Sequence, residues 1–412
     1  MTGVVHVVGA GLAGLAAATK LAGWGRKVVV HEAGRMAGGR CRSYFDQQLG
    51  LTIDNGNHLL LACNHAAMTY LRRIGALDAL DGPQECVFDF MDLASGERWR
   101  LRPNAGRLPW WIFSSDRRVP GTSASDYLGG IGLLTANARK TVTQALTPRG
   151  ALWDRLWKPV LVSALNTQLD EASAQLAAAI VRESLGAGGL AARPRVPRHG
   201  LGPAFVDPAL AHLAAHGAEI RYGDRLRAIY FDDARANELD FGERTIALAA
   251  EDTVILATPA WIAAEIVPGL KAPTEHRAIL NAHYAIAPPN GMPLLTGVVG
   301  GLTEWLFAFP DRLSVTISAA DALIDEARDD IAEKIWREVA TIAGLGDAPM
   351  PSCRIVKEKR ATFAATPAQD ALRPGTRTHW NNLFLAGDWT QTGLPATIEG
   401  AIRSGERAAE FA

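Results

Sequence analysis

The 412 residues are 48% hydrophobic and 21% charged, which excludes a disordered or fibrous chain and fits one large or two ordinary globular domains. The formal net charge of -1 gives no overall attraction to nucleic acid, so no nucleic-acid partner is expected. Because no run of about 18 uninterrupted apolar residues occurs, no transmembrane helix is predicted.

The four cysteines are scattered along the chain. They form no CxxC pair and no Cys/His metal spacing, so we expect reduced thiols in a cytoplasmic protein and no metal site. Any membrane contact would be peripheral, at the inner face of the membrane. The cysteines are Cys41, Cys63, Cys86 and Cys353.

The first 32 residues have the pattern of a strand, a glycine-rich turn, a helix and a second strand. An apolar run, Val4–Val8, leads into Gly9-Ala10-Gly11-Leu12-Ala13-Gly14, and an Ala/Leu-rich stretch to Gly25 precedes a second strand ending at Glu32. In a dinucleotide-binding unit the three glycines make the tight turn, admit a pyrophosphate and pack the helix, while the acidic residue accepts from a ribose. An apolar leader peptide is the alternative, but no basic residue precedes Lys20.

Polar, glycine-containing segments recur further along the chain. Gly38-Gly39-Arg40 could bring Arg40 or Arg42 to a phosphate, or could be a surface turn with solvated arginines. The chain ends with a strand running into Gly387-Asp388, where the carboxylate could accept from a sugar-like hydroxyl. Pro395 then suits the first turn of a helix whose N-terminus would face an electron-rich group. NAD would need only the first unit, so these repeated contacts predict the larger cofactor FAD.

Between these parts the chain changes character. Residues 77–202 lack the alternation of strands and helices. Residues 266–359 form a second inserted segment, in which a helix is predicted over 325–343. The sequence thus predicts an α/β protein with a Rossmann-like FAD-binding domain and an inserted mixed α+β substrate domain. The FAD-binding domain comprises residues 1–76, 203–265 and 360–412; the substrate domain comprises 77–202 and 266–359.

One part of the inserted region is basic and rich in tryptophan. Eleven basic and four acidic side chains lie between Glu97 and Lys158, interleaved with six tryptophan and phenylalanine residues. Indoles and arginines together suit a membrane interface. The alternative is that the tryptophans are core residues and the arginines a solvated face. The aromatic residues are Trp99, Trp110, Trp111, Phe113, Trp153 and Trp157.

The glycine-containing segments resemble those of the monoamine oxidase, phytoene desaturase and Rab-escort superfamily of flavin folds. Within it, the whole chain most resembles the hydroxysqualene dehydroxylases, also called squalene-associated FAD-dependent desaturases. That resemblance lies in Trp157-Lys158-Pro159, Ala164-Leu165-Asn166-Thr167, Val206-Asp207-Pro208-Ala209 and the segment from Gly387-Asp388-Trp389-Thr390 to Pro395-Ala396-Thr397.

The resemblance implies a set of residues that hold FAD. Gly9, Gly11 and Gly14 would hold the pyrophosphate, Glu32 the ribose, and Arg40 the phosphate region. Leu226 would lie in the strand that meets adenine, Asp388 would contact the ribitol, and Gly56, Asn57 and Ala396–Ile398 would border the flavin ring. The remaining implied contacts are Leu12, Ala13, Ala33, Gly38, Gly39, His58, Gly387, Pro395 and, within the last range, Thr397.

The resemblance also implies a reaction in squalene and hopanoid biosynthesis. The hydroxyl of hydroxysqualene, a long apolar isoprenoid, is removed reductively: hydride from reduced flavin N5 reaches an allylic carbon and water leaves. A proton donor to the leaving oxygen would help, and Asp154 and His58 are the candidates. Either could instead be structural, Asp154 in an ion pair and His58 in packing.

No second nucleotide fingerprint occurs, so an external electron donor is expected. Two other functions remain open at this point. One is an FAD-dependent desaturase or oxidase acting on a polyisoprenoid or an amine, and the other is a non-enzymatic prenyl-binding escort on the same fold.

Overall fold

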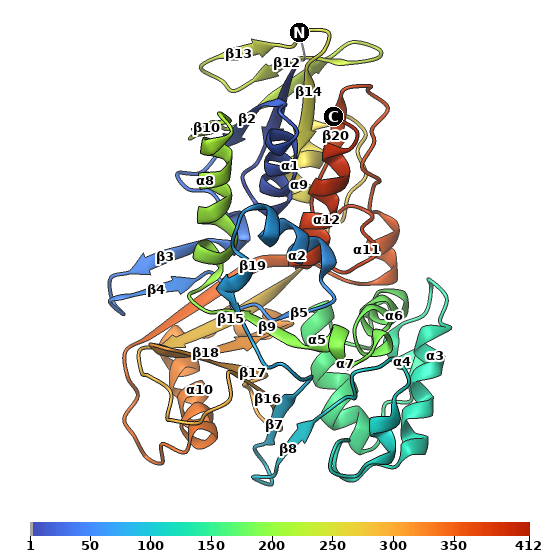
Figure 1. Ribbon diagram of the computed structural model, residues 1–412, viewed down its shortest axis with the longest axis vertical. Helices are drawn as coiled ribbons and strands as arrows, with labels where there is room; N and C mark the ends of the chain where they lie inside the picture. The colour runs from blue at the N-terminus through green and yellow to red at the C-terminus, as the bar shows by residue number, and fades with distance from the viewer. Residues whose placement is uncertain (1–2) are drawn as a thin grey trace.

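The computed structural model describes residues 3–412, and a five-stranded parallel sheet forms its upper part (Figure 1). Strand order is β10-β2-β1-β14-β20, so the sheet joins both ends of the chain to its middle. Strands that are covered on both faces read as continuous apolar runs, as β1, β14 and β20 do, whereas the edge strand β10 is polar and partly exposed. Their bounds are β1 Val4–Val8, β2 Lys27–Glu32, β10 Glu219–Tyr222, β14 Thr253–Leu256 and β20 Leu383–Leu385.

Helices cover one face of this sheet. α1 and α12 pack side by side there, flanked by α8 and α2 (Figure 1). On the other face lie α9 and a three-stranded antiparallel sheet, β11-β12-β13. The bounds are α1 Leu12–Gly23, α2 His65–Arg73, α8 Asp207–Ala215, α9 Ala260–Ile266, α11 Pro367–Ala371, α12 Ile398–Ala409, β11 Ala228–Phe231, β12 Ala236–Asp240 and β13 Thr245–Ala247.

Two boundary predictions in this part are wrong. The strand expected from Leu226 begins only at Ala228, because residues 223 and 224 still donate to Gly34 and Glu32 at the end of β2, and the chain then has to cross to β12. Pro395 does not lie in the first turn of α12. Thr397 is the N-cap there, and its hydroxyl accepts from the amide of Gly400 at 3.0 Å.

Two buried histidines link the strands of the parallel sheet. His31 Nδ1 lies 2.6 Å from Asp224 Oδ2, and His31 Nε2 lies 3.0 Å from His6 Nδ1. A carboxylate only accepts, so His31 donates from Nδ1 and its Nε2 accepts from His6. Burial, followed by the neighbouring His31, lowers the pKa of His6 to about 4. Burial also lowers the pKa of His31, so both rings are neutral at pH 7.

This network predicts acid sensitivity. The unfolded chain binds a proton at His6 near its ordinary pKa, whereas the folded chain resists it, so stability is full above about pH 6.5 and is lost as pH falls toward 4. The expected loss is about 3 kcal/mol. His6→Asn keeps a donor to His31 and should flatten the dependence, as measured by urea denaturation across this range. Equal pH dependence in both proteins would show that His6 does not cause it.

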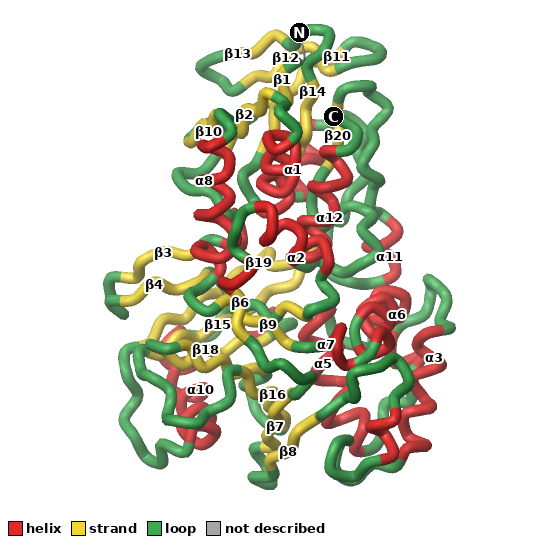
Figure 2. The backbone as a smooth tube through the Cα atoms, viewed as in Figure 1, coloured by secondary structure: helices red, strands yellow, loops and turns green. Residues whose placement is uncertain are grey.

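The second large element is a seven-stranded sheet in the order β19-β15-β18-β17-β16-β7-β8. All neighbours are antiparallel except β16 and β7. One face packs on α10, while α5 lies near β16. Figure 2 shows these strands between α10 and the group α3 to α7. The bounds are β7 Phe88–Asp92, β8 Arg98–Leu101, β15 His276–Tyr284, β16 Leu295–Val299, β17 Trp305–Phe309, β18 Arg312–Ile317, β19 Cys353–Phe363 and α10 Arg328–Ala343.

The remaining elements are short. The predicted domain division stays a proposal, and β19 runs through its 359/360 boundary. Among residues 3–412, no helix has the length and apolarity to cross a bilayer. The bounds are α3 Gly130–Leu134, α4 Val142–Ala145, α5 Lys158–Leu165, α6 Ala174–Glu183, α7 Gly189–Ala192, β3 Ser43–Asp46, β4 Leu51–Asp54, β5 Leu60–Leu61, β6 Leu80–Asp81 and β9 Pro194–Pro197.

Candidate active site

The three glycines of the turn after β1 differ in how much space surrounds them. A Cβ on Gly9, whose φ is +108°, would lie 2.6 Å from the carbonyl oxygen of Ala257, and a Cβ on Gly14 would lie 1.8 Å from the oxygen of Gly9. A Cβ on Gly11 would meet nothing within 4 Å. Gly9 and Gly14 are therefore required by the fold, while Gly11 borders open space at the N-terminus of α1. The pyrophosphate is predicted to lie there, since helix-terminal amides favour an anion.

Glu32 ends β2 beside this turn. Its carboxylate accepts from the amide of Ala10 at 2.8 Å and from that of Gly34 at 2.6 Å, and Ala33 between them is exposed. The carboxylate therefore fixes the end of β2 against the glycine turn, where a ribose contact is predicted. Leu226, predicted to line adenine from a strand, is buried in the irregular segment before β11.

Arg40 brings the two ends of the chain together. Gly38 donates to the carbonyl of Ala10 at 2.8 Å, so the segment returns to the first turn. Arg40 Nη2 lies 2.7 Å from Asp388 Oδ1, and its Nη1 donates to the carbonyl of Ala361 at 2.6 Å. The predicted phosphate and ribitol residues thus form one ion pair, which couples the N-terminal segment to the end of β20.

Gly56, Asn57 and His58 lie where the two sheets meet. The buried Asn57 donates from Nδ2 to Thr316 Oγ1 at 3.1 Å, and its Oδ1 accepts from Ser314 at 3.0 Å. Its side chain is therefore engaged by the second sheet, as is its backbone amide, which donates to Asn281 Oδ1 at 3.2 Å, so a contact of this segment with the flavin ring stays a prediction. His58 is half-buried, and burial lowers its pKa, so its ring is neutral at pH 7.

The start of α12 contains a contact that the sequence prediction missed. Glu399 is 2% exposed, and its two carboxylate oxygens accept from the amides of Ala66 and Ala67 at 3.0 and 2.9 Å, in the first turn of α2. This places α2 against the N-terminus of α12, next to the predicted flavin contacts Pro395–Ile398. The only sequence signal is one acidic residue on the apolar side of α12.

Within residues 3–412, Asp154 forms no hydrogen bond or ion pair with the other predicted site residues. It is exposed in the turn Trp153–Trp157, whereas Trp153 next to it is buried. The other tryptophans of the basic region divide: Trp99 and Trp111 are buried, Trp157 is half-buried, and Trp110 is exposed. The expectation of core tryptophans therefore holds for part of that region only.

An apolar wall lies beside the polar contacts of Asn57. Trp305 pairs with Thr316 and Phe307 with Ser314 across β17 and β18, so these side chains share one face of the sheet. Phe309 continues this row, and Phe90 of β7 packs against Trp305 with ring centroids 5.8 Å apart. The face of the second sheet thus changes from polar to aromatic as it leaves the predicted flavin position.

Glu304, directly before β17, was also missed. Its carboxylate accepts from the amide of Ser318 at 2.7 Å, and burial raises its pKa to about 7. An isolated glutamate before a tryptophan carries no signal of burial, because the loop before β17 and the end of β18 are brought together only by the sheet.

The raised pKa of Glu304 predicts that folding stability depends on pH in the opposite direction to the effect of His6. The folded state keeps the carboxyl protonated above its ordinary pKa, so stability falls as pH rises from about 4.5 through 7, by about 3 kcal/mol. Glu304→Gln preserves the acceptor for Ser318 and should be more stable than the wild type at about pH 8 but not at about pH 5. Urea denaturation measures this, with the exposed Glu333→Gln of α10 as control. A wild-type advantage at the higher pH would contradict the assignment.

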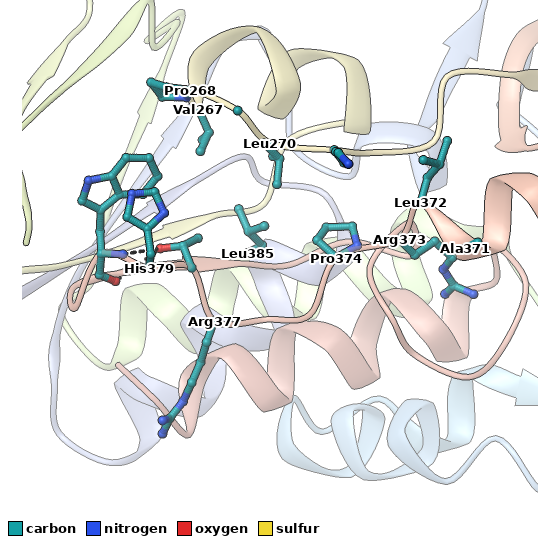
Figure 3. Close-up of a pocket in the computed structure, with 14 residues that line it drawn as sticks. Val267, Pro268, Leu270, Ala371, Leu372, Arg373, Pro374, Arg377, His379 and Leu385 are labelled. Carbon is teal, nitrogen blue, oxygen red and sulfur yellow. Dashed lines mark hydrogen bonds between the residues drawn. The ribbon is translucent and has the colours of Figure 1, made fainter.

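A separate cavity of about 310 Å³ lies between the loop after α9 and the segment following α11 (Figure 3). Arg373 lines it and donates from Nη2 to the carbonyl of Asp388 at 3.2 Å. Arg377 points away from it in Figure 3 and lies 4.2 Å from the ring centroid of Phe411. This cavity therefore lies next to the turn at Asp388, and none of the residues predicted to bind the cofactor lines it.

Fold and site together define an FAD-dependent oxidoreductase. The family model described as flavin containing amine oxidoreductase matches residues 12–287 and 288–411. A hydroxysqualene dehydroxylase from Rhodopseudomonas palustris is 56% identical over all of this chain and 98% of its own length, and one from Sinorhizobium fredii is 50% identical over 99% and 98%. The chain belongs to the hydroxysqualene dehydroxylase family, within the flavin-containing amine oxidoreductases.

A solved structure supports the fold alone. Cyclohexylamine oxidase from Brevibacterium oxydans superposes with a TM-score of 0.69 over 100% of this chain and 98% of its own, at 17% identity. The α/β fold with an FAD-binding part and a mixed second part, predicted from sequence, is confirmed.

Proposed function

We propose that this protein converts hydroxysqualene to squalene by reductive removal of the hydroxyl group, as the names of its relatives state for them. Identity of 56% over the full chain carries this proposal. The relatives' names do not favour the desaturase, amine oxidase and escort alternatives.

The residues at the two chain ends would hold FAD. Gly11 would leave room for the pyrophosphate, Glu32 would contact the ribose, and the ion-paired Arg40 and Asp388 would contact the phosphate and the ribitol. When bound and reduced, the flavin supplies the hydride for the allylic carbon. The residue-by-residue contacts remain predictions, as does the external electron donor.

A proton has to reach the leaving oxygen, and His58 is the better placed of the two predicted donors, although its ring, neutral at pH 7, would first have to take up a proton from solvent. It follows Gly56 and Asn57 directly, whereas Asp154 is exposed elsewhere. Its Nδ1 lies 3.5 Å from the carbonyl of Gly56, at the limit of a hydrogen bond, so the ring is only weakly held.

His58→Gln tests this role. If His58 is the donor, kcat should fall by a factor on the order of 10²–10⁴ while FAD content stays unchanged. Asp154→Asn is the matched control and should keep its kcat. Single-turnover formation of squalene from FAD-loaded protein measures both. If only Asp154→Asn lost activity, Asp154 would be the proton donor. If both variants stayed active, neither residue would be the donor.

The function itself is tested by incubating FAD-loaded protein with hydroxysqualene and a chemical reductant. Squalene should appear by mass spectrometry only when both FAD and reductant are present. Folded, flavin-loaded protein that forms no squalene would overturn the proposal, and a dehydrogenated product formed with an oxidant would favour the desaturase alternative.

A further inference from the structure

Exposed apolar side chains gather on one part of the molecule. Across residues 3–412, fourteen large apolar side chains are exposed, and half of them lie in the segment after β8 or on α7 beside it. We call these seven residues the docking face. They are Leu108, Trp110, Phe113, Leu128, Ile131, Leu134 and Leu190.

Contacts between buried side chains and backbone groups connect the segments that carry the docking face. Trp111 packs edge-on against Tyr127 with ring centroids 5.1 Å apart, which joins the Trp110–Phe113 turn to the segment before α3. Asn104 Oδ1 accepts from the amide of Trp111 at 3.1 Å, and the amide of Leu190 donates to Ala105 at 3.2 Å. Trp110 and Phe113 therefore project from a fixed turn, 64% and 65% exposed.

Positive charge surrounds these apolar residues. Arg107, Arg139, Lys140 and Arg149 are exposed, and none of the four forms an ion pair with a carboxylate of the described chain. Two of the acidic side chains nearby are engaged, whereas Asp154 is exposed and forms no ion pair within residues 3–412. Asp116 pairs with Arg102 at 2.7 Å, and an oxygen of Asp126 accepts from the amide of Ser123 at 2.7 Å.

We propose that the docking face binds the surface of an anionic phospholipid bilayer. An indole at the boundary of an apolar patch suits the headgroup level, and unpaired arginines and lysine suit anionic lipid. Figure 1 places α3 and α4 at the opposite end of the molecule from the parallel sheet, so the FAD-binding part would face away from the bilayer.

The docking face is also continuous with the aromatic wall. Trp111 and Ile112 lie on the inner side of the same turn and belong to one packed cluster with Phe307 and Phe309. Because this cluster is packed and buried, entry of a bilayer-dissolved isoprenoid from the docking face would require these side chains to move apart. This route rests on the proposed function, whereas binding to the bilayer does not.

The test is flotation of FAD-loaded protein with vesicles of phosphatidylglycerol and phosphatidylcholine in equal parts, and with phosphatidylcholine alone. The wild type should float with the anionic vesicles at low salt. Trp110→Ser combined with Phe113→Ser should lower the partition coefficient at least about tenfold. The control is Phe45→Ser on the distant β3–β4 hairpin, where the side chain is 63% exposed, and it should bind like the wild type.

Charge provides the second arm. Arg139→Gln with Lys140→Gln should weaken binding roughly fivefold per charge at low salt, with a smaller difference at high salt. No flotation of the wild type would overturn the proposal. The proposal would also be overturned if the wild type were a dimer, the Trp110/Phe113 variant were a monomer, and neither bound vesicles. The docking face would then be an interface between two copies.

Activity in detergent separates this proposal from the proposed function. The Trp110/Phe113 variant should form squalene from detergent-dissolved hydroxysqualene at the wild-type rate and lose rate only with substrate in vesicles. Wild-type protein that floats but forms no squalene would remove the function and leave the docking face. An equal loss of rate in detergent would show that these residues act in the site rather than at a bilayer.

Discussion

Gly11→Ala should give a folded protein that no longer retains FAD. A methyl group there meets no protein atom within 4 Å, and the backbone has φ -74° and ψ 176°, which alanine adopts freely. The same methyl would occupy the space proposed for the pyrophosphate. Losing two charge-assisted hydrogen bonds would weaken binding by about 3 kcal/mol or more, on the order of a hundredfold.

The measurement is FAD titration of apoprotein, followed by flavin fluorescence, with urea denaturation alongside. Stability without FAD should stay within about 1 kcal/mol of the wild type, since alanine is only a poorer N-cap. Gly14→Ala is the contrasting variant, because its methyl would overlap the Gly9 oxygen and disturb the fold itself. Wild-type FAD affinity in folded Gly11→Ala would show that the pyrophosphate lies elsewhere.

Gly405→Ala should strongly destabilise the protein. A Cβ on Gly405 would lie 2.0 Å from the carbonyl oxygen of Ala13, where α12 crosses the first turn of α1. The two helices would have to separate, at a cost of about 3 kcal/mol. Because both helix N-termini border the predicted cofactor site, FAD retention should fall as well.

The control for this variant lies on the same pair of helices. Gly23→Ala in the last turn of α1 adds a methyl whose nearest contact is a side-chain nitrogen of His212 at 4.0 Å, so stability should be unchanged or slightly higher. Thermal unfolding of the apoproteins compares them. Equal midpoints for Gly405→Ala and the wild type would mean that α1 and α12 are not held as closely as their contact requires.

The parts of the fold that the sequence predicted are those with local signals. β1, the glycine turn and α1 form within 20 residues, and the spacing of their glycines encodes the contacts that the structure contains. Glu32 could be placed for the same reason. The two ends of the chain could be assigned to one site only through the resemblance of Arg40 and Asp388 to flavin motifs, since nothing local says that these residues pair.

The parts that were missed depend on contacts between distant segments. Asn57 is held by Thr316, and Glu399 by the amides of Ala66 and Ala67, more than 200 residues away in each case. A polar residue read alone gives no sign of burial or of its partner. The same limit explains why the exposure of Asp154 and Trp110 could not be predicted, because composition cannot tell which side of a short turn faces solvent.

The most direct test of the account is a single turnover under anaerobic conditions. FAD-loaded protein is reduced, freed of excess reductant and mixed with hydroxysqualene, and the squalene formed is compared with the flavin reoxidised. The account predicts equal amounts of the two and no squalene from the oxidised protein. Squalene formed without flavin reoxidation, or reduced protein that leaves hydroxysqualene unchanged, would contradict it.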